Sequence, residues 1–290
     1  MTARAELLLS LLVTELRQVG MFDSKIAEYQ KETHFPGPFL PYVARIREQR
    51  SRLVAGVFKV DTYLSIRGNR PPHLQAEEFD VNLPSTLGAW CSFPLSIFYC
   101  RQDEEPSDRK DRKIFELCSI PQLAAPSVML VEDVLLGLCG LWPHIWRFTR
   151  TGPYRRPSES GKDSIALADL LGGWKRHLEK LSALVAGQNS DQITPFIKAY
   201  RGLEDENSSH GRLAAAGRAN SLLHEALALL EALRSALWAI LNPPEPGETR
   251  PPDRQVSSQR YEFQQPTGQG LRAKCHSKTS SMYAPSKVGF

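Results

Sequence analysis

Asp61 is an acidic residue in a helical segment that otherwise looks built for burial. Apolar residues recur there at steps of three and four, at Leu53, Val57, Val60 and Leu64. A neighbouring stripe consists of Val54, Phe58 and Asp61. An unpaired carboxylate at the edge of an apolar face is costly. We therefore expect Asp61 to accept a hydrogen bond or to pair with a cation from another element.

The chain contains none of the common sequence motifs of catalysis. GxGxxG, GxxxxGK[ST], HExxH and GxSxG are all absent. Glu132 and Asp133 are adjacent, which would place them about 100° apart on a helix rather than as a carboxylate pair. His144, between Trp142 and Trp146, is expected to be an interior or interfacial histidine rather than a catalytic base. We predict no enzymatic activity.

The cysteines do not form a metal-binding pattern. They lie at positions 91, 100, 118, 139 and 275, with no CxxC pair and no histidine at a spacing suited to zinc. We expect reduced thiols and no metal or other cofactor in this chain.

Aromatic residues suggest one binding site as an alternative hypothesis. An apolar cavity among Phe58, Trp90, Trp142 and Trp146, with His144 beside it, could take a hydrophobic metabolite. In that case the chain would be a free-standing helical binding protein without a role in transcription. The competing interpretation is that these aromatic side chains are core residues.

A candidate phosphorylation site lies at Ser158. Arg155 and Arg156 precede it in an RRxS pattern that a basic-directed kinase could recognise. Such patterns are also common by chance in basic loops.

The spacing of apolar residues predicts an all-α fold with one short extended segment. Helices are expected over residues 3–19, 41–67, 128–147, 167–185 and 195–200, and in a last helix that ends at Leu241. The helix over 128–147 is expected to break or kink near Gly140 and Pro143. Residues 78–84 alternate apolar and polar side chains, which is typical of an extended segment. The charged run 101–113 is expected to be a solvated connection or an exposed helix start.

The domain organisation follows from composition. The chain has 290 residues, 41% of them hydrophobic and 23% charged, and a formal net charge of only +4. These values favour one irregular helical domain over residues 1–242, with a loop between its halves at 149–164. Residues 243–290 are rich in Pro, Ser, Gln and basic residues, and we expect this tail to be disordered. No membrane span is expected, because no apolar run is long enough.

The last helix carries a leucine-rich seam. Its members are Leu223, Ala226, Leu230, Leu233, Leu237 and Ile240. We favour burial of this seam inside the same domain. A homodimer through Leu223, Leu230 and Leu237 is the alternative.

Residues 7–90 resemble the fungal-specific transcription factor domain, or middle homology region, of fungal zinc-cluster and zinc-finger regulators. The resemblance rests on four stretches, LLVTELRQVGMFD, GVFKVDTYLSI, RGNRPPHL and EEFDVNLPSTLGAW. The residues that match the family motif are Asp61, Ser65, Arg70, Pro71, Pro72, Asp80, Pro84 and Trp90. The resemblance implies that these eight are scaffold residues.

The family resemblance also implies a function. Such domains regulate transcription in the nucleus, or in nucleus and cytoplasm, through intramolecular contacts, coregulators or small molecules, while a separate zinc module contacts DNA. This chain contains neither a six-cysteine cluster nor a C2H2 finger. We therefore expect that it begins downstream of the true start, or that it acts through transcriptional coregulators or a DNA-binding protein, without specific DNA contacts of its own.

Overall fold

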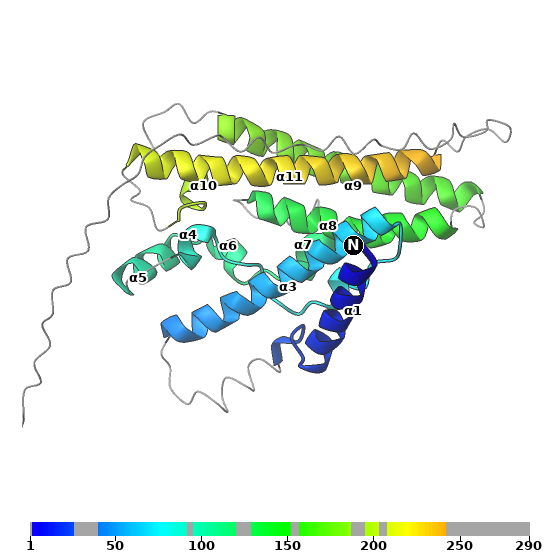
Figure 1. Cartoon of the computed structure of the whole chain (residues 1–290). Coiled ribbons are helices and arrows are strands. Elements are labelled where there is room, and N and C mark those ends of the chain that lie inside the picture. Colours follow the sequence, from blue (N-terminus) through cyan, green and yellow to red (C-terminus); the bar gives the residue numbers. More distant parts are fainter. Residues whose placement is uncertain are drawn as a thin grey trace, which may run out of the picture. The chain divides into compact units, whose positions relative to one another are not determined.

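Most of the described chain is helical, and no strand occurs among the described residues, which confirms the predicted fold class. The computed structural model describes residues 2–25, 40–91, 95–119, 129–151, 157–186, 195–202 and 208–241. The helices are α1 (Thr2–Gln18), α3 (Leu40–Gly68), the 3-10 helix η1 (Ala76–Glu78), α4 (Leu87–Trp90), α5 (Leu95–Asp103), α6 (Ser107–Lys110), α7 (Ile114–Ser119), α8 (Val131–Thr151), α9 (Pro157–Ala186), α10 (Pro195–Lys198) and α11 (Ser209–Leu241) (Figure 1).

The chain divides into two units, Met1–Pro243 and Pro244–Phe290. All described residues belong to the first unit. The predicted disordered tail, residues 243–290, lies outside the described residues. Within the first unit, buried apolar side chains from α1, α3, α7, α8, α9, α10 and α11 form one core cluster.

Helix α8 lies at the centre of this core, in contact with α3, α7, α9 and α11. It is continuous through Gly140 and Pro143, so of the two predicted alternatives the break is wrong, and the kink stays a prediction. The two glycines of α8 serve close packing instead. A Cβ atom at Gly137 would lie 2.1 Å from the Trp174 ring of α9, and one at Gly140 would lie 2.4 Å from Cys118 Cβ of α7.

Helix α11 packs against α8 and α9, beside which it runs in Figure 1. Five of the six seam residues, Leu223, Ala226, Leu230, Leu233 and Leu237, are at most 4% exposed, and the side chain of Ile240 lies outside the described part. The favoured interpretation, burial inside the same domain, is confirmed. Because Leu223, Leu230 and Leu237 lie in the core of their own chain, they are not exposed to a second copy.

Helix α3 buries only part of the predicted apolar stripe, in which Val57 is 6% exposed. Leu53 and Val60 are 41% and 47% exposed, whereas Val54, Phe58 and Asp61 are completely buried. Both stripes are apolar enough to be a core face. The packing partners of α3, which are remote in sequence, determine which stripe is buried.

The extended segment begins at Phe79, directly after η1. Phe79, Val81 and Leu83 are buried, and Asp80 and Asn82 are not, which confirms the predicted alternation. Asn82 forms an isolated antiparallel bridge with Lys113. The Ile114 amide donates to the Val81 carbonyl (2.9 Å) and the Leu83 amide to the Arg112 carbonyl (2.8 Å).

The predicted loop at 149–164 is mostly helical. Helix α8 extends to Thr151 and α9 begins at Pro157, so the prediction is wrong for residues 149–151 and 157–164. Proline at the first helical position is favourable, because its φ is already helical and its missing N–H would have no intrahelical partner. Ser158 therefore lies in the first turn of α9, where its side chain is outside the described part.

Candidate functional site

The site that the sequence singles out lies over residues 52–84, which we call the motif segment. It includes the C-terminal half of α3, the Pro71-Pro72 turn, η1 and the extended segment. Its polar side chains tie these pieces to α1, α7 and α8, as the following contacts show.

The end of α3 is fixed by a left-handed residue, Asn69. Asn69 has φ 45°. Its amide donates to the Ile66 carbonyl (3.2 Å), and the Arg70 amide donates to the Ser65 carbonyl (3.1 Å). This pair of bonds is the Schellman pattern, with Asn69 at the left-handed position. The chain leaves the helix in one defined direction as a result.

Ser65 joins this helix end to the central helix. Its hydroxyl group donates to the Arg70 carbonyl, and it accepts a hydrogen bond from the Trp142 indole N–H of α8 (2.6 Å). Ser65 is completely buried and Trp142 is 4% exposed. The predicted scaffold residue Ser65 therefore connects α3, the turn and α8.

Asp61 has a buried partner, as expected, but the partner is backbone rather than a cation. Its Oδ2 accepts a hydrogen bond from the Leu74 amide at 2.8 Å. Both residues are completely buried. Burial raises the pKa of the Asp61 carboxyl group above its usual value, and the Leu74 hydrogen bond opposes this only in part. Asp61 thus anchors the residues after Pro72 against α3.

Two arginines bind the turn to α1. Arg70 lies 3.6 Å from Glu6 of α1 and 2.7 Å from the His73 ring. Arg17 of α1 donates to the His73 carbonyl (2.7 Å) and to the Glu78 carboxylate (2.9 Å). Pro71 and Pro72 lie between these contacts and keep the chain from continuing as a helix.

Asp80 connects the extended segment to α7 and to the residues after α1. Its carboxylate pairs with Lys113 and accepts a hydrogen bond from Ser24, and its amide donates to the Phe22 carbonyl (2.9 Å). The hydrogen bond from Lys113 lowers the pKa of Asp80 most, and the hydrogen bond from Ser24 lowers it further.

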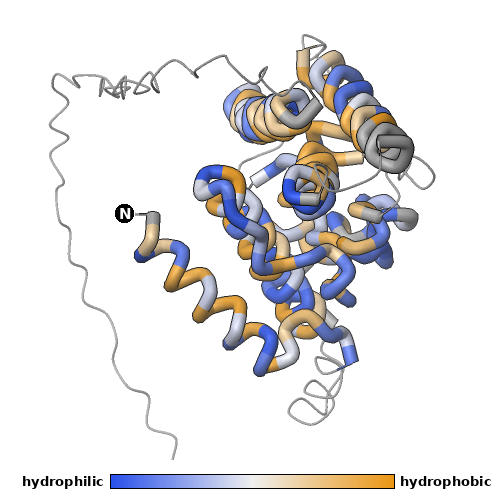
Figure 2. Tube along the Cα trace, turned by 90° about the vertical axis from the view of Figure 1, so that its right-hand side faces the viewer, coloured by the Kyte–Doolittle hydropathy of each residue, from blue (hydrophilic) through white to orange (hydrophobic). Residues whose placement is uncertain are grey.

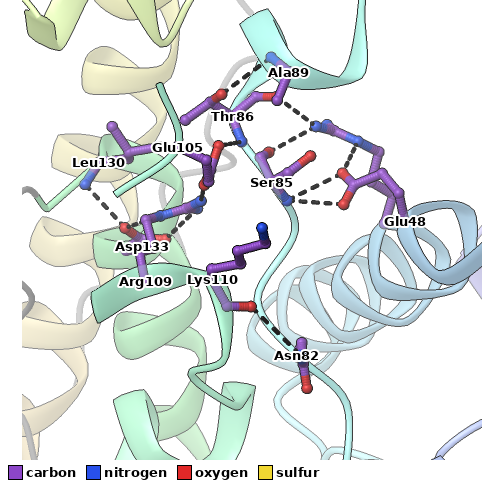
Figure 3. A network of polar contacts seen from close by, with 11 residues as sticks. Glu48, Asn82, Ser85, Thr86, Ala89, Glu105, Arg109, Lys110, Leu130 and Asp133 are labelled. Carbon is purple, nitrogen blue, oxygen red and sulfur yellow. Dashed lines mark hydrogen bonds and ion pairs between the residues drawn. The ribbon is translucent and has the colours of Figure 1, made fainter. Parts of the chain in front are cut away.

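A second network begins at Ser85, the residue after the buried Pro84. Figure 3 shows this network. The Ser85 amide donates to both oxygens of Glu48 (3.1 and 2.9 Å), and Arg52 pairs with Glu48 at 2.6 Å. The Thr86 amide donates to Glu105 (3.0 Å). These bonds fix Ser85 and Thr86, which connect the motif segment to the start of α4.

Glu105, Arg109 and Asp133 form a buried charged triad that the sequence did not reveal. Arg109 lies 2.7 Å from Glu105 and makes two bonds to Asp133, at 3.0 and 2.8 Å (Figure 3). Asp133 also accepts from the Leu130 amide at 2.9 Å. Arg109 is only 2% exposed and Asp133 is completely buried. The neighbouring carboxylates raise the pKa of Arg109 against the effect of burial, so it stays charged.

The prediction that residues 101–113 are solvated is therefore wrong for several of their side chains. Arg101 and Glu105 are also buried, and Arg101 donates to the carbonyls of Gly88 (3.0 Å), Cys91 (3.2 Å) and Gly202 (3.2 Å). The spacing of four between Glu105 and Arg109 was the available signal. Their partners in α8 and near α10 are too distant in sequence to be inferred from it.

Trp90 ends the region of family resemblance and stacks under cationic side chains. The guanidinium carbons of Arg52 and Arg45 lie 5.3 and 5.6 Å from its ring centroid. Such contacts stabilise both partners modestly at a half-buried site.

The residues of the predicted ligand pocket have separate surroundings. Phe58 is completely buried against Phe79, with ring centroids 4.9 Å apart, and Trp142 is buried with its N–H bonded to Ser65. Trp146 is half-buried beneath Arg150. His144 is exposed, 4.0 Å from Glu77, so its predicted interior position is wrong. The core interpretation is confirmed for Phe58 and Trp142.

The cysteines of the described region are all free thiols. Cys118 and Cys139 are buried, Cys91 is intermediate and Cys100 is exposed. Burial raises the pKa of Cys139 to about 12, so this thiol stays protonated. Across the described ranges, no group of three or more His, Cys, Asp or Glu residues is placed to hold a metal ion.

Comparison with known proteins gives no relative for this chain. No family model, curated protein or solved structure matches it. Among the helices that the structure describes, none is long and apolar enough to cross a membrane.

Proposed function

We propose that this chain is the regulatory domain of a fungal transcription factor and acts in transcription through contacts other than direct DNA recognition. The observation that carries the proposal is the role of the motif residues. Asp61, Ser65 and Arg70 all hold the turn that follows α3. The family resemblance implies just such scaffold residues.

The chemistry of the motif segment supports a scaffold rather than a reaction site. Asp61 accepts from a backbone amide, Ser65 bridges two elements, and Asp80 is paired with Lys113. A general base or a nucleophile must instead direct its lone pair at a substrate. Side chains that bond to partners inside the protein hold the motif segment in one conformation. A regulatory domain needs such a defined conformation to present its surface to partners.

The test is transcription from a tethered chain. The full chain is fused to a bacterial repressor DNA-binding domain and expressed in a filamentous fungus that carries a reporter gene with the matching operator. We expect reporter transcription to differ from that with the DNA-binding domain alone. The untethered chain should leave the reporter unchanged, because the proposed domain does not bind DNA specifically itself.

A matched pair of variants tests whether the tethered effect requires the intact folded domain. Arg109→Met removes the cation of the buried triad, whereas Arg234→Met changes an exposed arginine on α11. The Arg109 variant should lose the tethered effect and the Arg234 variant should keep it. If the tethered chain and both variants give the same transcription as the DNA-binding domain alone, the proposal is wrong.

A further inference from the structure

Helix α1 exposes a patch of leucines that the fold does not use. Leu7, Leu8, Leu11 and Leu12 are 61%, 59%, 56% and 41% exposed. On the opposite side of the helix, apolar residues are buried in the core, at Leu9, Val13 and Leu16. Figure 2 shows apolar residues along α1, which starts at the label N and lies at the margin of the helical unit. Contiguous apolar surface of this kind is typical of an interaction site.

Charged residues of opposite sign flank this patch on the same face. Arg4, Leu8, Leu11 and Glu15 follow one another at steps of four, three and four, so they lie on one stripe of the helix. Arg4 and Glu15 are both exposed. The cation is at the N-terminal end of the leucines and the carboxylate at the C-terminal end.

This order of side chains is complementary to itself in an antiparallel pair. When two copies of α1 are placed antiparallel about a twofold axis, Arg4 faces Glu15, Leu8 faces Leu11, and Leu7 faces Leu12. A twofold interface uses the same surface on both copies, so each of these pairs occurs twice. We propose that α1 forms an antiparallel homodimer contact with α1 of a second copy.

The charges favour a second copy over other occupants. A parallel pair would place Arg4 opposite Arg4 and Glu15 opposite Glu15, which is repulsive. A lipid surface is favoured by helices with a Lys- and Arg-rich polar face. The polar residues of α1 include Glu6 and Glu15 beside Arg4 and Arg17, so its charge is balanced.

The contact should be weak, because two turns of one helix make a small interface. We expect a dissociation constant of about 1–100 μM, in the range of transient rather than obligate dimers. Sedimentation equilibrium of the full chain over that concentration range measures it. A chain that stays monomeric throughout would overturn the proposal.

Charge-swap variants test the antiparallel register. Arg4→Glu and Glu15→Arg each turn two attractive pairs into two repulsive ones, so each should weaken dimerisation by about tenfold. The double variant exchanges the two charges and should restore the wild-type constant. The control is Arg176→Glu on the exposed side of α9, which makes the same change in charge as Arg4→Glu and should have no effect. Failure of the double variant to restore dimerisation would overturn the register.

A leucine variant tests the apolar part of the contact. Leu11→Ser should abolish dimerisation at the highest concentration used. Leu213→Ser on α11, where the native leucine is 72% exposed, is the matched control and should leave dimerisation unchanged. Circular dichroism should show both variants as helical as the wild type, since both leucines lie at the surface. A Leu11 variant that dimerises normally would exclude α1 as the contact.

Discussion

At the scale of residues, buried polar side chains connect the helices at defined points. Asp61 and Arg109 are both buried, but their charges are compensated differently. Arg109 lies between two carboxylates, whereas Asp61 accepts a hydrogen bond from the Leu74 amide. Burial without a directly bonded cation destabilises the ionised form of Asp61, and the hydrogen bond from Leu74 reduces this destabilisation.

Asp61 should make stability depend on pH in a direction that can be calculated. Its pKa in the folded state is raised above the usual 3.8. The folded protein therefore binds this proton more tightly, and the resulting stabilisation is complete below pH 3.8 and is lost as the pH rises through the raised value. Urea unfolding of wild type and Asp61→Asn between about pH 7 and pH 4 measures this. Relative to the Asn variant, wild type should gain stability as the pH falls.

Comparison with the Asn variant removes the contribution of other groups, such as Asp80, whose lowered pKa acts in the opposite direction. Asp61→Ala is a second variant, which measures the contribution of the hydrogen bond to Leu74. It leaves the buried Leu74 amide without its acceptor and should cost about 1–3 kcal/mol in the free energy of unfolding. A stability difference between wild type and Asp61→Asn that does not change with pH would contradict the account.

Arg109 should be among the most sensitive positions in the chain. Arg109→Met leaves Glu105 and Asp133 buried without their cation, which should lower the free energy of unfolding by about 3–5 kcal/mol. Arg234→Met, which removes an exposed pair with Glu231, should change it by less than about 1 kcal/mol. Chemical unfolding of the two variants measures both values. Equal effects would show that the triad does not stabilise the fold.

At the scale of elements, the glycines of the long helices have different roles. Gly137 of α8 allows Trp174 of α9 to approach, whereas nothing lies within 4 Å of a Cβ atom at Gly56 of α3. Gly137→Ala should therefore destabilise the protein by about 1–3 kcal/mol through overpacking. Gly56→Ala should stabilise it by about 0.5–1 kcal/mol, because alanine favours the helix. Thermal unfolding of both variants measures these changes. Melting temperatures that shift in the same direction in both variants would contradict this packing of α8 and α9.

The elements that were predictable are those whose signals are local. The alternation of Phe79, Val81 and Leu83 identified the extended segment, and the proline pair after Arg70 placed the end of α3. The spacing of leucines in α11 likewise predicted a buried face. In the extended segment and in α11, the period of the side chains determines the local structure and its apolar side. At the end of α3, the two prolines stop the helix.

The features that were not predictable depend on partners far along the chain. Two adjacent stripes of α3 are apolar, and the contact with α8 determines that Phe58 rather than Leu53 is buried. A break or kink was expected near Gly140, but α8 is not broken there, and this glycine allows the close approach of Cys118. Arg109 was placed in a solvated run because its acceptor Asp133 lies 24 positions away.

At the scale of the whole molecule, one core joins helices from α1 to α11, and the motif segment is tied into it from three sides. Ser65 bonds to α8, Arg17 of α1 bonds to Glu78, and Asp80 pairs with Lys113 beside α7. The leucines of α1 remain exposed at the margin of this unit. In the proposals made above, this unit is a regulatory domain, and α1 is a weak self-association surface on it.

The central claim, a regulatory role in transcription without DNA recognition by this chain, is tested most directly by the tethered reporter. The quantity to measure is reporter transcription with the fused chain, divided by that with the DNA-binding domain alone. The account predicts a ratio that differs from one for wild type and Arg234→Met and returns to one for Arg109→Met. A wild-type ratio of one, with the fusion folded and bound at its operator, would contradict it.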